Sequence, residues 1–334
     1  MPRKITNKNA PPSPRSRRTA KVRRKAVLPQ KAQQRKIHES DMEEMLVRDL
    51  VNPSKPDDNG IALEDLIYSI TPKLSKEAYG FGYSVGKTIS AISGDSSALI
   101  TALGKLGFRN VQYQPFRDAL VVKSTARKHA AIIVGSRIHF FEAGIIAGYL
   151  SGYSKEKIST SEKECLYNGD SCCRFVSHTG RQLDEHQGSD PSRIIDAIAS
   201  KIRNVTFAER ATMEYYSLPF IPMLKQPLRG EIAKVLYASG KELASKSQRN
   251  ESEELIRNAS GYFGASCNGI IMGQKNGFVK LEYSHHNSNS GFVELSTALI
   301  SGFMSGRFSR EPSIYINVDK NMNYVVEITT SVHK

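Results

Sequence analysis

Three of the four cysteines, Cys165, Cys172 and Cys173, lie within nine residues, and the fourth, Cys267, stands alone. A secreted protein held together by disulfides carries more cysteines, spread more widely along its chain. The cluster therefore predicts a local metal or redox site, because thiolates bind zinc and also oxidise in pairs. We expect Cys267 to be an ordinary core residue.

The cysteine cluster lies on residues 157–177, whose pattern is typical of a β-hairpin turning at residues 168–170. A three-residue turn would place Cys165 opposite Cys173, on one face and ready to share a metal ion. A two-residue turn would place Cys165 opposite Cys172, as a cross-strand pair that can oxidise. The residues alone leave both registers open.

The elements that must position this hairpin occur twice. YSVGK at 83–87 matches YASGK at 237–241, and IAGYLSG at 146–152 matches ISGFMSG at 300–306. Both matches have the same displacement of 154 residues. A shared displacement of this kind predicts two copies of one fold.

Within each copy the order of signals is the same: a helix, a second helix after a break, alternating strands, a helix rich in small residues and then a hairpin. Valine, isoleucine and tyrosine content indicates strands at 110–122 and 130–134 of the first copy. The predicted parts of the chain are a disordered basic arm at 1–36, a helical linker at 37–74, a first domain at 75–180, a connecting segment at 181–227 and a second domain at 228–332.

Residues 141–153 predict a helix in which three glycines, spaced four apart, lie on one ridge. Each glycine costs about 1 kcal/mol relative to alanine inside a helix. Close packing of a sheet or another helix must offset this cost. The three glycines are Gly144, Gly148 and Gly152, and their counterparts in the second copy are Ala298, Gly302 and Gly306.

These motifs resemble the vinyl-reductase-like domain family, named after a 4-vinyl reductase. The resemblance rests on FEAGIIAGYL at 141–150, on Glu162 three residues before Cys165, and on Asn168-Gly169-Asp170 followed by Cys173-Arg174-Phe175. The resemblance implies an α+β fold for each copy, with helices packed on a mainly antiparallel sheet. In zinc-bearing members the metal is held by a cysteine before the glycine-rich helix, a glutamate and two hairpin cysteines.

The resemblance implies a zinc site made of Glu162, Cys165 and Cys173, with His139 where the family has its first cysteine. Imidazole nitrogen also binds zinc, and a closed set of four ligands implies a structural rather than a catalytic ion. The alternative is a hydrogen-bonded core histidine among cysteines that are merely small and buried. Glu164 is equally near, and a regular strand would point Glu162 and Cys165 to opposite faces.

The second copy is expected to lack the metal. The displacement of 154 puts Val293 at the position of His139, Asp319 at that of Cys165 and Glu327 at that of Cys173. We expect this copy to complete an intrachain pseudo-dimer or to form a separate pocket.

Charge distinguishes the arm from the rest of the chain. Residues 1–36 hold 13 Lys or Arg and no acidic residue, which leaves only +1 of the net charge of +14 for the remainder. This composition predicts disorder and an electrostatic contact with nucleic acid or a ribonucleoprotein. A solubilising tail, a contact with a phosphate-rich membrane surface and a targeting segment stay open as alternatives. The residues expected to bind nucleic acid are Arg15, Arg17, Arg18, Lys21, Arg23, Arg24 and Lys25.

The residues give little indication of an enzyme active site. Gly80-Phe81-Gly82 does not continue into a dinucleotide-binding fingerprint, and no set of nucleophile, base and orienting group emerges. The resemblance implies a pocket for a hydrophobic small molecule, so we expect a non-enzymatic sensor or regulator. The alternatives are a structural assembly subunit and, more distantly, an enzyme of tetrapyrrole or aromatic metabolism.

The apolar segments are too short for a membrane-spanning helix or a secretory signal. We expect a cytoplasmic protein, with homo-oligomerisation left open.

Overall fold

The computed structural model describes most of the chain after residue 38. The described residues are 39–51, 63–116, 119–124, 134–180, 190–203, 224, 226–261, 263, 265–283, 290–321 and 323–330. Contacts divide the chain after Lys36, and every described residue belongs to the unit 37–334. The predicted arm, 1–36, lies outside the described residues.

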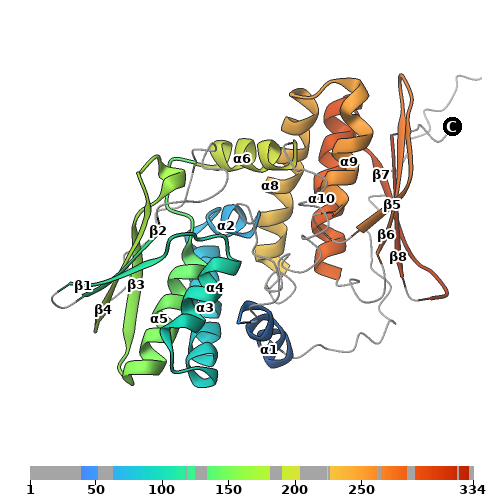
Figure 1. Ribbon diagram of the computed structural model, residues 1–334. Helices are drawn as coiled ribbons and strands as arrows, with labels where there is room; N and C mark the ends of the chain where they lie inside the picture. Colours follow the sequence, from blue (N-terminus) through green and yellow to red (C-terminus); the bar gives the residue numbers. More distant parts are fainter. Residues whose placement is uncertain are drawn as a thin grey trace, which may run out of the picture. The chain divides into compact units, whose positions relative to one another are not determined.

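The described residues of the first half form five α-helices and four strands. These are α1 (Glu39–Leu50), α2 (Leu63–Tyr68), α3 (Pro72–Ile92), α4 (Ser96–Lys105), β1 (Gln112–Phe116), β2 (Ala119–Ser124), α5 (Phe140–Ser154), β3 (Ile158–Glu164) and β4 (Cys173–Thr179). The strands form one antiparallel sheet in the order β1-β2-β4-β3. Figure 1 shows α3 and α5 side by side on one face of this sheet.

Local sequence explains where these elements begin. Thr71 caps α3, since its hydroxyl accepts a hydrogen bond from the Leu74 N–H and Pro72 occupies the first turn. Asp95 caps α4 through the Ser97 N–H. The predicted strand 110–122 is two strands, with Pro115 on the edge strand β1, where its missing N–H costs least. Residues 130–133 lie outside the described residues, and Val134 is not in a strand.

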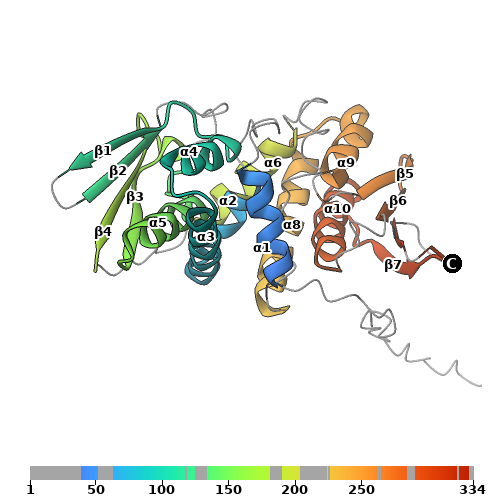
Figure 2. The same cartoon turned by 60° about the horizontal axis from the view of Figure 1, so that its bottom comes forward.

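Apart from α2, which has no counterpart among the described residues, the second half follows the same order of elements, again with helices on one face of the sheet (Figure 2). Its elements are α6 (Pro191–Arg203), α8 (Gln226–Ser245), α9 (Ser252–Gly261), β5 (Ala265–Met272), β6 (Gly277–Tyr283), α10 (Ser290–Phe308), β7 (Ser313–Val318) and β8 (Tyr324–Thr329). The strand order β5-β6-β8-β7 repeats that of the first sheet, position for position.

The predicted glycine ridge packs against a helix rather than against the sheet. A Cβ at Gly148 of α5 would overlap the carbonyl oxygen of Tyr83 in α3. A Cβ at Gly302 of α10 would overlap the carbonyl oxygen of Tyr237 in α8. The two glycines are 154 residues apart, and so are the two tyrosines. The repeat detected in the sequence is therefore also a repeat of backbone contacts.

The first helices of the two halves also correspond. Helix α1 contacts α3 and α4, and α6 contacts α8 and α9. The predicted linker and connecting segment therefore contribute helices that pack in the same way on each half. In the part of the chain that the structure describes, no helix is both long and apolar enough to cross a membrane.

Candidate metal centre

The four residues that the family resemblance selected lie together in the first half. One potential ligand atom from each of His139, Glu162, Cys165 and Cys173 lies within 4.8 Å of all the others. The four side chains are buried, and the most exposed, Glu162, retains only 7% of its accessible surface. Burial of so many ionisable groups is costly unless they are paired or bound to a metal ion.

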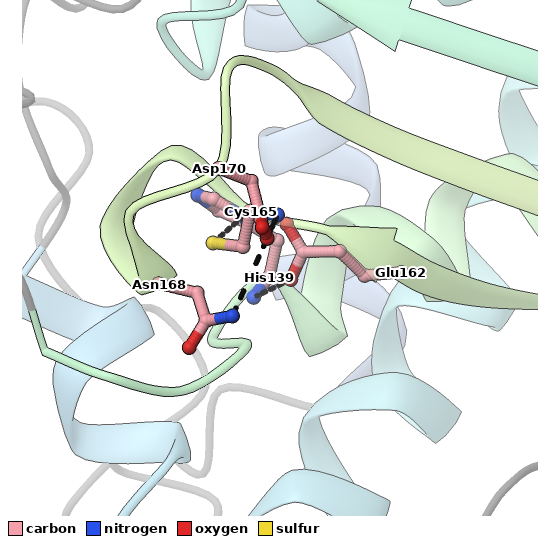
Figure 3. A network of polar contacts seen from close by, with 5 residues as sticks. All are labelled: His139, Glu162, Cys165, Asn168 and Asp170. Atoms are coloured by element: carbon pink, nitrogen blue, oxygen red, sulfur yellow. Dashed lines mark hydrogen bonds and ion pairs between the residues drawn. The ribbon is translucent and has the colours of Figure 1, made fainter.

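His139 directly precedes helix α5 and contacts Glu162 twice. Its ring Nδ1 lies 2.5 Å from Glu162 Oε1, and its backbone N–H donates to Glu162 Oε2 at 3.3 Å (Figure 3). The carboxylate therefore sits at the N-terminus of α5, where the helix dipole favours negative charge. The histidine and the glutamate are held in place by the junction of α5 with the edge strand β3.

A β-bulge in β3 removes the geometric objection to Glu162. Pairing with β4 shifts between Glu162, which faces Phe175, and Glu164, which faces Arg174, so Lys163 is the extra residue. The shift lets Glu162 and Cys165 point to the same, buried face. Glu164 points to the other face, where its Oε1 accepts from Arg174 Nε at 2.9 Å.

The connection between β3 and β4 is longer than either predicted turn, but it gives the register that favours a metal. A short 3₁₀ helix, Leu166–Asn168, follows Cys165, and Gly169 adopts a φ of 95°. Asp170 Oδ2 accepts the backbone N–H of Cys165 at 2.8 Å (Figure 3). Cys165 thereby meets Cys173, and the alternative pairing of Cys165 with Cys172 is wrong.

A hydrogen bond joins the sulfurs of Cys165 and Cys173, and it shifts their pKa values in opposite directions. Burial raises the pKa of the Cys165 thiol, which donates to its partner. That hydrogen bond, assisted by nearby His139, lowers the pKa of Cys173 to about 5. A lowered pKa favours the thiolate form of Cys173, which is the form that binds metal ions, whereas Cys165 must lose its proton to bind one.

Cys172 has a separate role on the opposite side of the hairpin. Its thiol donates to Glu164 Oε2 at 3.0 Å, although its neighbour Cys173 faces the cluster. All four cysteines are free thiols. Cys267, the isolated cysteine, is partly buried and packs against the core as predicted.

Aromatic rings enclose the imidazole. The ring centroids of Phe108, Tyr167 and Phe175 lie 5.1, 5.5 and 6.2 Å from that of His139. The Tyr167 carbonyl accepts the backbone N–H groups of Val134 and Gly135, which ties the chain before α5 to the hairpin. This apolar wall keeps water away from the cluster, and sequence patterns did not reveal it, because Phe108 lies far from the hairpin in the chain.

The donor set fits a zinc ion. Tetrahedral zinc with nitrogen, sulfur and oxygen ligands places neighbouring ligand atoms roughly 3.3–3.8 Å apart. Cys165 Sγ and His139 Nδ1 are 3.6 Å apart, within that range. The His139–Glu162 distance is that of a hydrogen bond, so this pair must separate slightly for both groups to bind an ion.

The second half has no such cluster among its described residues. Val293 occupies the place of His139 and is buried, and Asp319 accepts the N–H groups of Asn321 and Asn323 within its own turn. The hairpin connection is three residues shorter than in the first half, so β8 begins at Tyr324 where β4 begins at Cys173. Glu327 was therefore the wrong counterpart of Cys173.

Tyrosines fill this region of the second half. Tyr324 is paired with Tyr283 of β6, and both are buried. The Tyr283 hydroxyl is hydrogen-bonded to Ser296 of α10. The predicted nucleic-acid-binding residues lie outside the described residues, namely Arg15, Arg17, Arg18, Lys21, Arg23, Arg24 and Lys25.

Comparison with known proteins gives distant similarities. No protein-family profile matches the chain. An uncharacterized protein of Methanocaldococcus jannaschii is 27% identical over 118 residues, which make up 35% of this chain and 65% of that protein. The match thus spans slightly less than two thirds of the relative's length.

Two solved structures are also similar to parts of the chain. A vinyl-4-reductase family protein from Methanocaldococcus jannaschii is 21% identical, with a TM-score of 0.28 over 32% of this chain and 68% of that one. A trafficking protein particle complex subunit 3 from Naegleria fowleri, covalently bound to palmitic acid, is 13% identical. Its TM-score is 0.25 over 44% of this chain and 100% of that one.

Proposed function

We propose that the chain is a non-enzymatic regulatory protein built from two vinyl-reductase-like domains, of which the first is stabilised by a structural zinc ion. The observation that carries this proposal is the convergence of four buried ligand atoms within 4.8 Å. Imidazole and two thiolates favour zinc over calcium or magnesium, which prefer oxygen ligands. With four protein ligands the ion has no open position for substrate, which supports a structural role.

The repeated backbone contacts support a tandem duplication. We assign residues 39–179 and 191–330 to the two domains, because α1 and α6 pack equivalently and the two sheets share one strand order. These bounds include helices of the segments predicted as the helical linker and the connecting segment. The pseudo-twofold arrangement of the two domains stays a prediction.

Metal analysis tests the zinc proposal directly. Protein purified without chelators should contain about one zinc per chain, and Cys165→Ser or Cys173→Ser should lose it, because structural zinc needs its full ligand set. Cys172→Ser is the matched control: it alters a neighbouring buried thiol that contacts Glu164 instead of the cluster. Full-length protein without metal, or a Cys172→Ser variant as depleted as Cys173→Ser, would contradict the proposal.

The arm supplies the proposed regulatory contact, with nucleic acid as its partner. It holds 13 of the chain's positive charges and no negative ones. Binding through such a segment releases counterions and has little sequence preference, so affinity should fall by orders of magnitude between about 50 and 200 mM salt.

Deletion of residues 1–36 tests this division of labour. The truncated protein should lose nucleic-acid binding but retain its zinc and its secondary structure, as measured by fluorescence anisotropy, metal analysis and circular dichroism. Equal binding by the truncated protein would assign the contact to the body. Absence of binding in both proteins would favour an assembly subunit over a sensor.

The ligand of the proposed sensor is a hydrophobic small molecule, the class that the family resemblance implies. Cytoplasmic location remains the prediction made from the sequence.

A further inference from the structure

Strand β7 has an outer edge that no described strand covers. It ends the second sheet, pairing only with β8 among the strands that the structure describes. Ile314 is 42% exposed although it lies on the face that packs toward the helices. Exposed edges with apolar side chains promote pairing with another strand, and proteins normally protect them.

The equivalent edge strand of the first sheet is protected. The Tyr79 hydroxyl of α3 accepts the outward N–H of Thr160 in β3 at 3.1 Å. The Ser151 hydroxyl accepts the N–H of Ile158 at 2.8 Å, at the start of the same strand. Side chains of the neighbouring helices therefore occupy the positions that a further strand would need.

The second half has lost both protecting contacts. Ala233, 154 residues after Tyr79, has no hydroxyl, and the Ser305 hydroxyl, 154 residues after Ser151, donates to Glu311 instead of contacting β7. By the same displacement Ile314 corresponds to Thr160, so its N–H points away from β8. The alternation of an antiparallel ladder gives Ile316 the same orientation.

The other edge of the second sheet has its own protection. Strand β5 carries a bulge between Cys267 and Gly269, which interrupts a regular edge. The Arg257 guanidinium also donates to the Cys267 carbonyl at 3.2 Å. Open pairing capacity is thus confined to β7 in the described part of this sheet.

We propose that β7 pairs with β7 of a second copy of this chain, in an antiparallel arrangement that joins the two sheets across a twofold axis. Residues 313–318 (SIYINV) carry no charge, so antiparallel pairing with a second copy places no like charges opposite each other. Such a contact is isologous and closes as a dimer instead of growing into a filament.

Antiparallel pairing suits the orientation of the free backbone groups. The backbone N–H and C=O groups of Ile314 and Ile316 point away from β8. The same groups of an antiparallel second β7 can form hydrogen bonds with them. The apolar side chains on this face then continue the inner surface of both sheets. One strand edge is smaller than a standard interface, so we expect a dissociation constant in roughly the micromolar range or weaker.

Analytical ultracentrifugation of the full chain over a concentration series tests the proposal. Unsubstituted protein should pass from monomer to dimer, and Ile314→Lys should weaken dimerisation at least about tenfold, because pairing would bury its ammonium group. Ile314→Val should dimerise normally, since it keeps a β-branched apolar side chain.

The matched control is Ile271→Lys, which makes the same change at an isoleucine that is 65% exposed on β5 of the same sheet. It should leave the dimer unchanged. A chain that stays monomeric at every concentration overturns the proposal, as does equal weakening by Ile271→Lys.

Hydrogen exchange distinguishes this dimer from one formed elsewhere, and it does not depend on a variant. The outward amides of Ile314 and Ile316 should exchange more slowly above the dissociation constant than below it, while those of the protected strand β3 should not change. Dimerisation without slower exchange at these two amides, or their protection in the monomer, would also overturn the proposal.

Discussion

Glu162 and Glu164 stand two residues apart and point to opposite faces of one strand. Glu162 accepts from the His139 backbone and contacts the imidazole, whereas Glu164 contacts Arg174 and Cys172. On a regular strand these two carboxylates would share a face. The extra residue of the bulge therefore decides which glutamate can serve as a metal ligand.

The carboxylates give a paired test at this scale. Glu162→Gln should lower zinc affinity at least about tenfold, because a neutral amide is a poorer ligand and cannot accept the His139 N–H equally well. Glu164→Gln should change it little, since that side chain lies on the other face. Competition with a chromogenic chelator measures both affinities, and similar losses in the two variants would count against the assigned ligand.

Tyr79 is a second residue whose hydroxyl has a specific structural task. Its replacement by phenylalanine leaves the Thr160 N–H without an acceptor, which should cost about 1–3 kcal/mol of unfolding free energy. Chemical denaturation measures this loss. Ala233, its counterpart in the second half, shows that the fold tolerates the absence of the hydroxyl at an open edge.

The same hydroxyl predicts an alkaline limit. Burial raises the pKa of Tyr79 from 10.0 to about 12, so the folded state favours the protonated phenol. Its contribution to stability is present below pH 10 and is lost as the pH rises toward 12. Tyr79→Phe should reduce the loss of stability between pH 10 and 12, and an unchanged pH dependence would refute this assignment.

At the scale of elements, the helix pairs are set by glycines at backbone crossings. Because Gly148 has no side chain, the Tyr83 carbonyl can approach it closely. The Tyr237 carbonyl approaches Gly302 in the same way. Side chains at these positions would force the helices apart, so both halves depend on glycine at equivalent positions. The ridge predicted from four-residue spacing is real, but only the structure identifies its partner as a helix.

Alanine substitution measures this dependence. Gly148→Ala should destabilise the protein by about 1–3 kcal/mol or more, since the added methyl group meets rigid backbone. Gly104→Ala in α4 is the matched control: a Cβ there meets nothing within 4 Å, so the change should stabilise by up to about 1 kcal/mol. Thermal and chemical unfolding give both values, and equal effects would argue against the crossing as the cause.

Sequence reasoning located the four clustered residues because the family motif carries their order, with His139 replacing a cysteine. It did not find the bulge at Lys163, since bulges depend on strand pairing, or Phe108, which reaches the imidazole only through tertiary packing. The predicted tight turn at residues 168–170 is not formed, because the chain between Cys165 and Cys173 contains a 3₁₀ helix. The repeat was detectable, but the membership of helices α1 and α6 in it was not, because their sequences share no motif.

On the scale of the whole molecule, the two halves fill the equivalent space beneath the hairpin with different side chains. The first places ionisable ligands beneath its hairpin, and the second places Tyr283 and Tyr324 there. A buried tyrosine pair contributes apolar area without a cofactor, whereas the first arrangement leaves buried charge unless a cation is bound.

Removal of metal should therefore affect the halves unequally. A strong chelator should speed hydrogen exchange in β3 and β4, because zinc binding is coupled to folding, and should leave β7 and β8 largely unaffected. Exchange followed by mass spectrometry resolves the four strands. Equal acceleration in both sheets would show either that the halves unfold together or that the ion lies elsewhere.

The compact spacing of the cluster has a consequence for biosynthesis. All four side chains lie between His139 and Cys173, and the residues that surround them belong to the first half. Domains generally fold in order as the ribosome extends the chain. We therefore expect the proposed first domain to capture its ion while the second half is still being translated, so that metal supply acts on the nascent chain before the strand proposed to form the dimer exists.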